Sequence, residues 1–317
     1  MSSLETKAAP ATIAAQHDAR GSRAQARRRN AGFALAMLGA IAFSGKAIIA
    51  KLAYRYGVDA VTLIMYRMLF AMPLFALIAW WAGRGKAPFT KRDWMGIALL
   101  GVTGYYLASF LDFLGLQYIS ASLERLILYL NPTIVLALGV LLYKKKVAAR
   151  QLLAIGISYC GVLLVFGHEV SFEGPDILLG GLLVFGSAVS YAVYLVYSGE
   201  MVHRLGSQRL VGWASLVACL CCLAQFPLLR PWSAAIVAPE VVWLSVLNAT
   251  LCTVAPILMV MMAVERIGAA AAAQTGMIGP LATIMMGVLI LGEPFTAWIA
   301  GGTLLVLAGI WLLTKWR

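Results

Sequence analysis

The sequence has little charge and very little histidine. Of its 317 residues, 12% are charged, 62% are hydrophobic and only three are histidines. Soluble domains carry about 25% charged residues, so this composition excludes a water-soluble fold and favours a chain that packs in lipid. A bilayer crossing needs about 20 mostly apolar residues. About ten crossings therefore fit, and no room remains for a soluble domain.

The sequence also lacks the patterns of several other protein classes. The five cysteines lie in apolar stretches, which excludes a disulfide framework. The histidines lie far from these thiols, and no nucleophile pattern or Gly-rich phosphate loop occurs. We therefore predict no metal, no cofactor and no enzymatic activity. The net charge of +12 is spread over loops and tails rather than one folded face, so we expect no nucleic-acid partner.

Apolar stretches fill the chain after a basic tail. Residues 1–31 are rich in Ala, Ser and Arg without apolar periodicity, which predicts a disordered cytoplasmic tail. A cleaved secretory signal is disfavoured, because the next stretch is long enough to span and nine more follow. Each span must be a helix, since lipid cannot satisfy free backbone groups. The predicted spans are 32–54, 60–82, 94–115, 119–142, 151–167, 177–199, 209–229, 241–263, 268–291 and 296–314.

The cations predict the orientation of these helices. If the tail is cytoplasmic, the loops on the same side hold most of the cations, and the segment from His168 to Asp176 on the other side holds no Lys or Arg. This distribution follows the positive-inside rule and predicts that both termini are cytoplasmic. The cations on the cytoplasmic side are Arg84, Lys86, Lys91, Arg92, Lys144, Lys145, Lys146, Arg150, Arg204, Arg209, Arg266, Lys315 and Arg317.

The sequence contains an internal repeat. A shift of 148 residues superposes Pro132 on Pro280 and Gly161 on Gly309 without a gap. Five crossings per repeat is an odd number, so the second repeat must enter the membrane from the opposite side. The fold we predict is all-α and polytopic. It has ten transmembrane helices in two inverted five-helix repeats, 32–169 and 177–317, around a central cavity.

The residues around the second repeat's last loop carry a family resemblance. The stretch Leu291-Gly292-Glu293-Pro294-Phe295, followed by Gly302 and Gly309, together with Arg67 in the second helix, resembles the EamA-type branch of the drug/metabolite transporter superfamily from Gly32 to Arg317. The sequence departs from the family pattern at Lys144-Lys145 and at Phe43. The resemblance implies a basket of helices with the fifth and tenth outside it. It also implies alternating access without ATP and the export of amino acids, other metabolites or drugs.

Five ionisable residues lie inside predicted spans, namely Lys46, Arg67, Asp112, Glu124 and Arg125. An ionisable side chain at mid-bilayer costs about 2.5 to 3.5 kcal/mol on insertion scales, so each needs a compensating role. Three cations and two anions leave one positive charge for a ligand carboxylate. We assign Arg67 to a structural ion pair and the other four to substrate binding. For Asp112 and Glu124, ion pairs that hold the helices together are an equal alternative.

Helical spacing adds aromatic and hydroxyl side chains to these candidates. Tyr105, Ser109 and Asp112 are spaced i, i+4 and i+7, which gives the third span one polar face. Tyr191 and Tyr194 lie too near mid-span for interfacial anchors. We therefore predict that these residues face the cavity and contact substrate.

The fourth and ninth spans supply the remaining candidates. Arg125 and Tyr129 share one helix face and lead to Pro132, which matches Pro280 in the other repeat. A proline frees a backbone carbonyl and permits a kink, so both prolines are candidate hinges, with a static bend as the alternative. Gln274 is a candidate cavity donor, although a hydrogen bond between helices is the favoured interpretation.

These features favour a secondary-active exporter of small metabolites, above all amino acids, in a bacterial inner membrane. The expected partners are a small-molecule substrate and the lipid bilayer, and the duplication favours a monomer. The cations keep a transporter of phosphorylated or nucleotide sugars open as an alternative. A membrane scaffold or sensor without a transport cycle is the alternative from another class.

Overall fold

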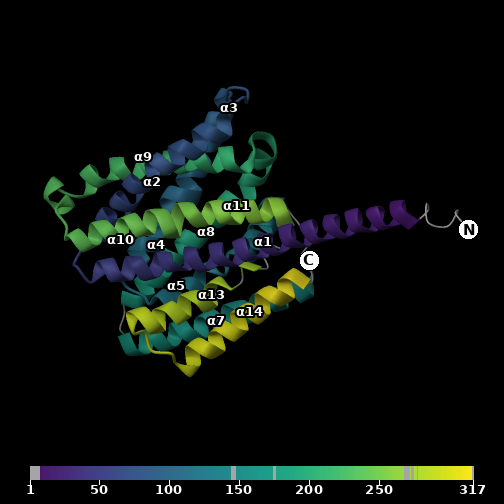
Figure 1. The fold of residues 1–317 in the computed structure, drawn as a ribbon. Helices are drawn as coiled ribbons and strands as arrows, with labels where there is room; N and C mark the ends of the chain where they lie inside the picture. The colour runs from purple at the N-terminus through teal and green to yellow at the C-terminus, as the bar shows by residue number, and fades with distance from the viewer. Residues whose placement is uncertain are drawn as a thin grey trace, which may run out of the picture.

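The computed structural model describes residues 8–143, 148–173, 176–267, 272, 275–276 and 278–315, and these residues are helical with short connections (Figure 1). The first half contains α1 (Ala8–Tyr54), α2 (Ala60–Gly83), α3 (Lys91–Leu100), the π-helical η1 (Gly101–Leu107), α4 (Ala108–Gly115), α5 (Ala121–Leu128), α6 (Asn131–Tyr143) and α7 (Ala149–Glu173). The second half contains α8 (Asp176–Leu205), α9 (Ser207–Leu229), the 3₁₀ turn η2 (Trp232–Ala235), α10 (Pro239–Ala249), the π-helical η3 (Thr250–Val254), α11 (Ala255–Ile267), α13 (Gly279–Met286), the π-helical η4 (Gly287–Leu291) and α14 (Ala297–Lys315).

The predicted spans correspond to these helices, singly or joined. By length and composition, eight helices of the described residues could cross a membrane, and the apolar helices Gly279–Leu291 and Ala297–Leu312 are shorter. The predicted ninth span, 268–291, lies partly outside the described residues. The fully helical fold is therefore confirmed, whereas the count of ten crossings stays a prediction.

The start of α1 differs from the tail that the sequence predicted. The structure places residues 8–31 in α1, whose first turns extend beyond the bundle in Figure 1. Alanine and arginine are strong helix formers, and residues 8–31 are rich in both. The prediction of a disordered tail was based on the missing apolar periodicity and gave less weight to the helix propensity of these residues.

The helices pack in equivalent ways in the two halves of the chain. α2 packs on α9, and α7 packs on α14. α1 packs on α10 and α11, and the counterpart of this contact in the other half is the packing of α8 on α4. Exchanging the halves therefore carries these contacts onto one another, as expected of a duplicated fold.

Small residues allow the closest of these contacts. A Cβ added to Gly161 of α7 would lie 2.6 Å from the Gly302 carbonyl oxygen of α14, and one added to Gly309 of α14 would lie 2.7 Å from the Ala154 carbonyl oxygen of α7. The 148-residue shift interchanges these two contacts. Close backbone approach at small residues is typical of helix pairs in membranes, so α7 and α14 form a tight pair at one side of the bundle (Figure 1).

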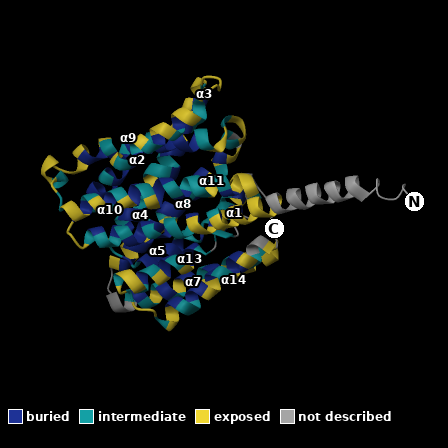
Figure 2. Ribbon diagram, in the orientation of Figure 1, coloured by how far each residue is buried: buried dark blue, intermediate teal, exposed yellow. Residues whose placement is uncertain are grey.

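Burial follows the same arrangement. Buried side chains line the helix faces that point into the bundle, and exposed ones lie on its outside and at the helix ends (Figure 2). Large apolar residues such as Trp243, Leu228 and Leu289 are 69%, 81% and 75% exposed. Such a surface is unfavourable in water and suits a lipid environment.

Candidate functional site

A cavity of about 490 Å³ lies inside the bundle and takes lining residues from both halves. The first half contributes from α1, α2, η1, α4 and α5, and the second from α8, α9, η3, α11 and α13. Among the residues predicted from the sequence, those that line the cavity are Lys46, Arg67, Tyr105, Ser109, Asp112, Arg125, Tyr129 and Tyr191.

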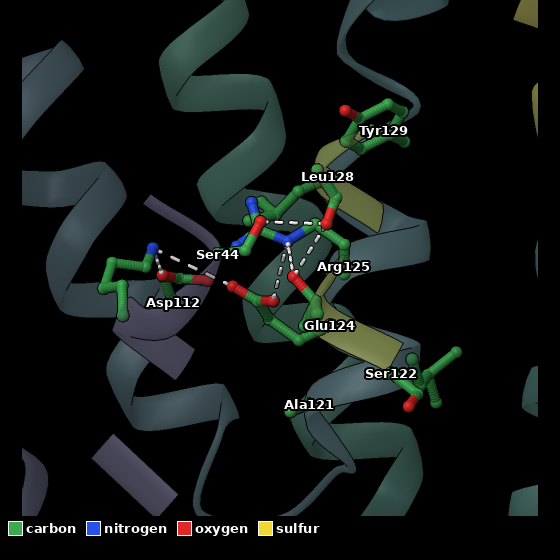
Figure 3. Close-up of polar contacts among 12 residues, drawn as sticks. Ser44, Asp112, Ala121, Ser122, Glu124, Arg125, Leu128 and Tyr129 are labelled. Atoms are coloured by element: carbon green, nitrogen blue, oxygen red, sulfur yellow. Dashed lines mark hydrogen bonds and ion pairs between the residues drawn. The ribbon is translucent and has the colours of Figure 1, made fainter. Parts of the chain in front are cut away.

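A chain of charged groups forms one wall of the cavity. Lys46 donates a hydrogen bond to Asp112 Oδ2, and its Nζ lies 3.8 Å from Glu124 Oε1. Glu124 Oε2 is 3.9 Å from Arg125 Nε, which donates to Thr283 Oγ1 at 2.9 Å. Figure 3 shows Asp112 of α4 next to Glu124 and Arg125, which are neighbours on α5. The four charges predicted to bind substrate therefore form one connected group.

Two of the buried guanidinium groups have free donors. Arg67 is 2% exposed and Arg125 is 4% exposed, yet Arg67 Nε and Nη2 and Arg125 Nη2 have no hydrogen-bond partner among the described residues. Buried donors without acceptors cost free energy. Both arginines line the cavity, so a ligand acceptor placed there would satisfy them.

Arg67 differs from its predicted role. No carboxylate of the described residues lies within 4.0 Å of its guanidinium. The group instead lies 4.5 Å from the ring centroid of Phe113, in a cation–π contact. Arg67 therefore belongs to the cavity wall, and the ion pair expected of it is not observed.

Two phenylalanine rings lie next to the buried cations Lys46 and Arg125. Lys46 Nζ is 5.4 Å from the Phe43 ring centroid and 5.7 Å from that of Phe113. Arg125 Cζ is 5.7 Å from the Phe43 ring. The electron-rich ring faces partly offset the repulsion among three cations at this depth.

Tyrosines also line the cavity. Tyr105 and Tyr194 share a hydrogen bond of 3.0 Å between their hydroxyls, and Tyr191 stacks on Tyr194 with ring centroids 5.5 Å apart. Tyr129 donates to the Gly276 carbonyl oxygen at 2.9 Å. Tyr194 does not line the cavity, so it supports Tyr105 and Tyr191 from behind.

The other predicted residues lie in different places. Glu124 is fully buried behind Lys46 and Arg125 and is absent from the cavity lining. Pro132 and Pro280 lie in the first turns of α6 and α13, outside the lining, and the fourth span breaks at Tyr129–Leu130 before Pro132. Gln274 lies outside the described residues.

Neutral polar residues that were not predicted from the sequence also line the cavity. Ser44 lines the cavity and donates to the Gly279 carbonyl oxygen at 2.8 Å, which joins α1 to α13. Asn131 and Thr253 also line the cavity. Ser44 lies two residues before Lys46, and Asn131 directly precedes Pro132. Proximity to a predicted site residue was therefore a usable signal for both.

A second contact between the halves lies at the N-terminus of α5. The Glu293 carboxylate accepts hydrogen bonds from Ala121 N at 2.8 Å, Ser122 N at 3.3 Å and Ser122 Oγ at 2.7 Å. A carboxylate at a helix N-terminus satisfies free N–H groups and complements the helix dipole. Arg55 adds a bond to the Leu291 carbonyl oxygen at 2.5 Å. We call this contact the Glu293 latch.

An apolar helical bundle with several helices long enough to cross a membrane defines a multi-pass membrane protein. The EamA-like transporter family model matches the chain twice, over residues 30–167 and 178–315. The chain therefore belongs to the EamA-like transporter family.

Similar proteins agree with this assignment. The chain is 30% identical over 275 residues to the "Uncharacterized transporter YcbK" of Bacillus subtilis, covering 84% of this chain and 87% of the relative. It is 24% identical over 258 residues to an "Uncharacterized transporter" of Archaeoglobus fulgidus, covering 81% and 88%. A solved crystal structure superposes with a TM-score of 0.61 at 16% identity, over 90% of this chain and 97% of that one, which shows a shared fold.

Proposed function

We propose that this protein is a secondary-active exporter of amino acids in a bacterial inner membrane. Its ten crossings form two inverted repeats with both termini in the cytoplasm, and the halves rock about the cavity so that it opens to one side at a time. Because both halves are present in one chain, a monomer suffices. Energy comes from solute gradients, without ATP.

One observation carries the choice of substrate. The cavity holds unpartnered guanidinium donors on Arg67 and Arg125 together with an unpartnered carboxylate oxygen, Asp112 Oδ1. An amino acid carries a carboxylate for the first group and an ammonium for the second. A zwitterion therefore satisfies buried groups of both signs, which neither a simple anion nor a simple cation does.

A phosphorylated substrate leaves part of this site without a partner. A phosphate group can accept hydrogen bonds from the free donors of Arg67 and Arg125, but it supplies no cationic group for Asp112 Oδ1.

Counterflow in proteoliposomes tests the proposal. Vesicles loaded with a mixture of unlabelled L-amino acids should transiently accumulate labelled amino acids from outside. Arg125→Gln removes a charged hydrogen-bond donor worth about 2 kcal/mol, so the apparent affinity should fall roughly 30-fold. The exposed Arg92→Gln is the matched control and should behave as wild type.

Two results would reject this function. Absence of counterflow for every amino acid would favour a scaffold or sensor. Competition by inorganic phosphate at low concentration would favour a transporter of phosphorylated sugars, because an amino-acid site has no reason to bind it tightly.

A further inference from the structure

The carboxyl groups of Asp112 and Glu124 form a buried pair next to the cavity. Asp112 is 2% exposed and Glu124 is 0% exposed. They come from α4 and α5, and Lys46 brings them together, because its Nζ donates to Asp112 Oδ2 and lies 3.8 Å from Glu124 Oε1. Only Asp112 lines the cavity. The pair therefore has an inner member and a member that faces the substrate.

Glu124 has less support than an ionised carboxylate requires. Neither of its oxygens accepts a hydrogen bond from any described residue. The nearest cationic atoms, Lys46 Nζ at 3.8 Å and Arg125 Nε at 3.9 Å, lie beyond hydrogen-bond distance. Both cations also have other partners, since Lys46 binds Asp112 and Arg125 binds Thr283.

Among the residues that the structure describes, no other element around α5 brings a charged group to Glu124. The Glu293 carboxylate, from the loop before α14, binds the first turn of α5 at Ala121 and Ser122. The helices α7, α8 and α14 pack on α5 through apolar residues, among them Val165, Val184 and Ile299. α13 contributes the hydroxyl of Thr283 through Arg125. Glu169 of α7 contacts Ser120, before the first turn of α5. Lys46 of α1, Asp112 of α4 and Arg125 of α5 are thus the charged groups that face Glu124.

Two carboxyl groups in contact away from water do not both ionise readily, because like charges repel and burial disfavours each charge. A single proton on the pair removes the repulsion and supplies the missing hydrogen bond. Lys46 then remains paired with the carboxylate that stays ionised. The arrangement suits a pair that binds and releases one proton.

We propose that Asp112 and Glu124 share one exchangeable proton and that this proton competes with the substrate's ammonium group, so that the protein exchanges an exported amino acid for an incoming proton. This inference rests on the proposed function. The unpartnered Asp112 Oδ1 is the acceptor for the ammonium, which needs the negative charge that a shared proton removes. When the ammonium binds, the proton leaves to solvent, and when the ammonium departs, a proton from the other side returns to the pair.

Proton release from the wild-type protein is the first test. Purified protein in weakly buffered detergent solution receives a mixture of L-amino acids, and a pH indicator records the response. We expect release approaching one proton per protein at a pH where the empty pair is protonated. If amino acids bind, as measured by heat or fluorescence, and no proton is released across the whole pH range in which the protein is folded, the inference is wrong.

Gradient-driven transport in proteoliposomes is the second test. An acidic vesicle interior should stimulate amino-acid uptake several-fold, because protons leave as the substrate enters. For Glu124→Gln, the ratio of uptake with the gradient to uptake without it should fall to about one. Glu240→Gln, the same change at an exposed position, should keep the wild-type ratio.

The outcomes separate the two proposals. A wild-type protein without amino-acid counterflow contradicts the proposed function itself. If the proton gradient does not change amino-acid uptake by the wild type, or if it still stimulates uptake by Glu124→Gln, only the proton exchange is overturned. If Glu124→Gln fails to fold or to transport, proton release by the wild type decides the question.

Discussion

Single charged residues determine where the substrate can bind. Burying Lys46, Arg67 and Arg125 in one bundle is unfavourable unless each finds a partner, and the structure supplies carboxylates for Lys46 and aromatic rings for all three. The donors that remain unpartnered face the cavity. The residues with the highest cost of burial are thus the ones with capacity left for a ligand.

Asp59 shows a residue-scale interaction that joins the halves outside the bilayer. It accepts hydrogen bonds from Val61 N at 2.9 Å and Thr62 Oγ1 at 2.6 Å at the start of α2, and it lies 3.1 Å from Arg230 Nε at the end of α9. Burial of its carboxyl tends to raise its pKa, but the hydrogen bonds from Thr62 and the charge of Arg230 lower the pKa below the usual value.

A lowered pKa predicts acid sensitivity at this position. The stabilisation from Asp59 is complete above the pKa of an unfolded Asp, about 3.9, and is lost as pH falls through the lower folded value. Asp59→Asn keeps an N-cap of similar strength but loses the ion pair with Arg230. It should therefore lower the free energy of unfolding at neutral pH by about 0.5 kcal/mol, as for an exposed ion pair, and flatten the acid dependence. Melting temperatures in detergent measured against pH check both effects. An unchanged acid dependence in the variant contradicts this role.

At this scale the sequence predicted several of the charged residues that line the cavity, for a physical reason. An ionisable residue inside a 20-residue apolar stretch stands out because lipid penalises it, so Lys46, Asp112 and Arg125 were identified before the structure. Neutral residues such as Ser44 and Thr253 carry no such penalty. The unpaired state of Arg67 depends on side-chain distances, which the sequence does not contain.

At the scale of helices, the sequence did not predict the π-helical segments. The π-helical segments η1 and η3 lie at matching positions, since the 148-residue shift carries 101–107 onto 249–255, which includes Thr250–Val254. Both line the cavity, through Tyr105 and Thr253. π-helical turns occur often at functional sites. Their wider hydrogen-bond register arises from tertiary packing, so apolar periodicity predicted only continuous helices there.

The Glu293 latch is an element-scale interaction that closes one end of the bundle. Its carboxylate replaces the partners that the first N–H groups of α5 lack, and it comes from the loop between η4 and α14. Opening that end requires the loop to leave α5. A neutral side chain binds these donors less strongly than a carboxylate, because charge-assisted hydrogen bonds are stronger than neutral ones.

Glu293→Gln should therefore loosen this end of the protein. We expect a loss of about 1 kcal/mol in stability, the difference between a charged and a neutral hydrogen bond. We also expect faster thiol labelling of a cysteine placed at Ala121, which is 0% exposed beneath the Glu293 carboxylate. Labelling rates and melting temperatures are compared with Glu240→Gln as the control. Equal labelling rates in the two variants would show that the latch does not restrain opening.

For the whole molecule, the duplication makes each loop of one half the counterpart of a loop in the other. The 148-residue shift carries Arg84, between α2 and α3, onto Trp232, between α9 and α10. These two connections lie at opposite ends of the bundle, and the described ends of α1 and α14 lie at the same end as the connection between α2 and α3 (Figure 1). This arrangement supports two halves with opposite orientations, which the odd number of crossings per repeat had predicted.

Labelling from one side of the membrane tests that orientation. In a background without the five native cysteines, Arg84→Cys should react only with reagents on the cytoplasmic side, and Trp232→Cys only with impermeant reagents added outside intact cells. Trp232 is 74% exposed and Arg84 is exposed, so accessibility does not bias the comparison. If both positions react from the same side, the halves are parallel. The inverted duplication, and the symmetry between the two cavity openings that it implies, would then be excluded.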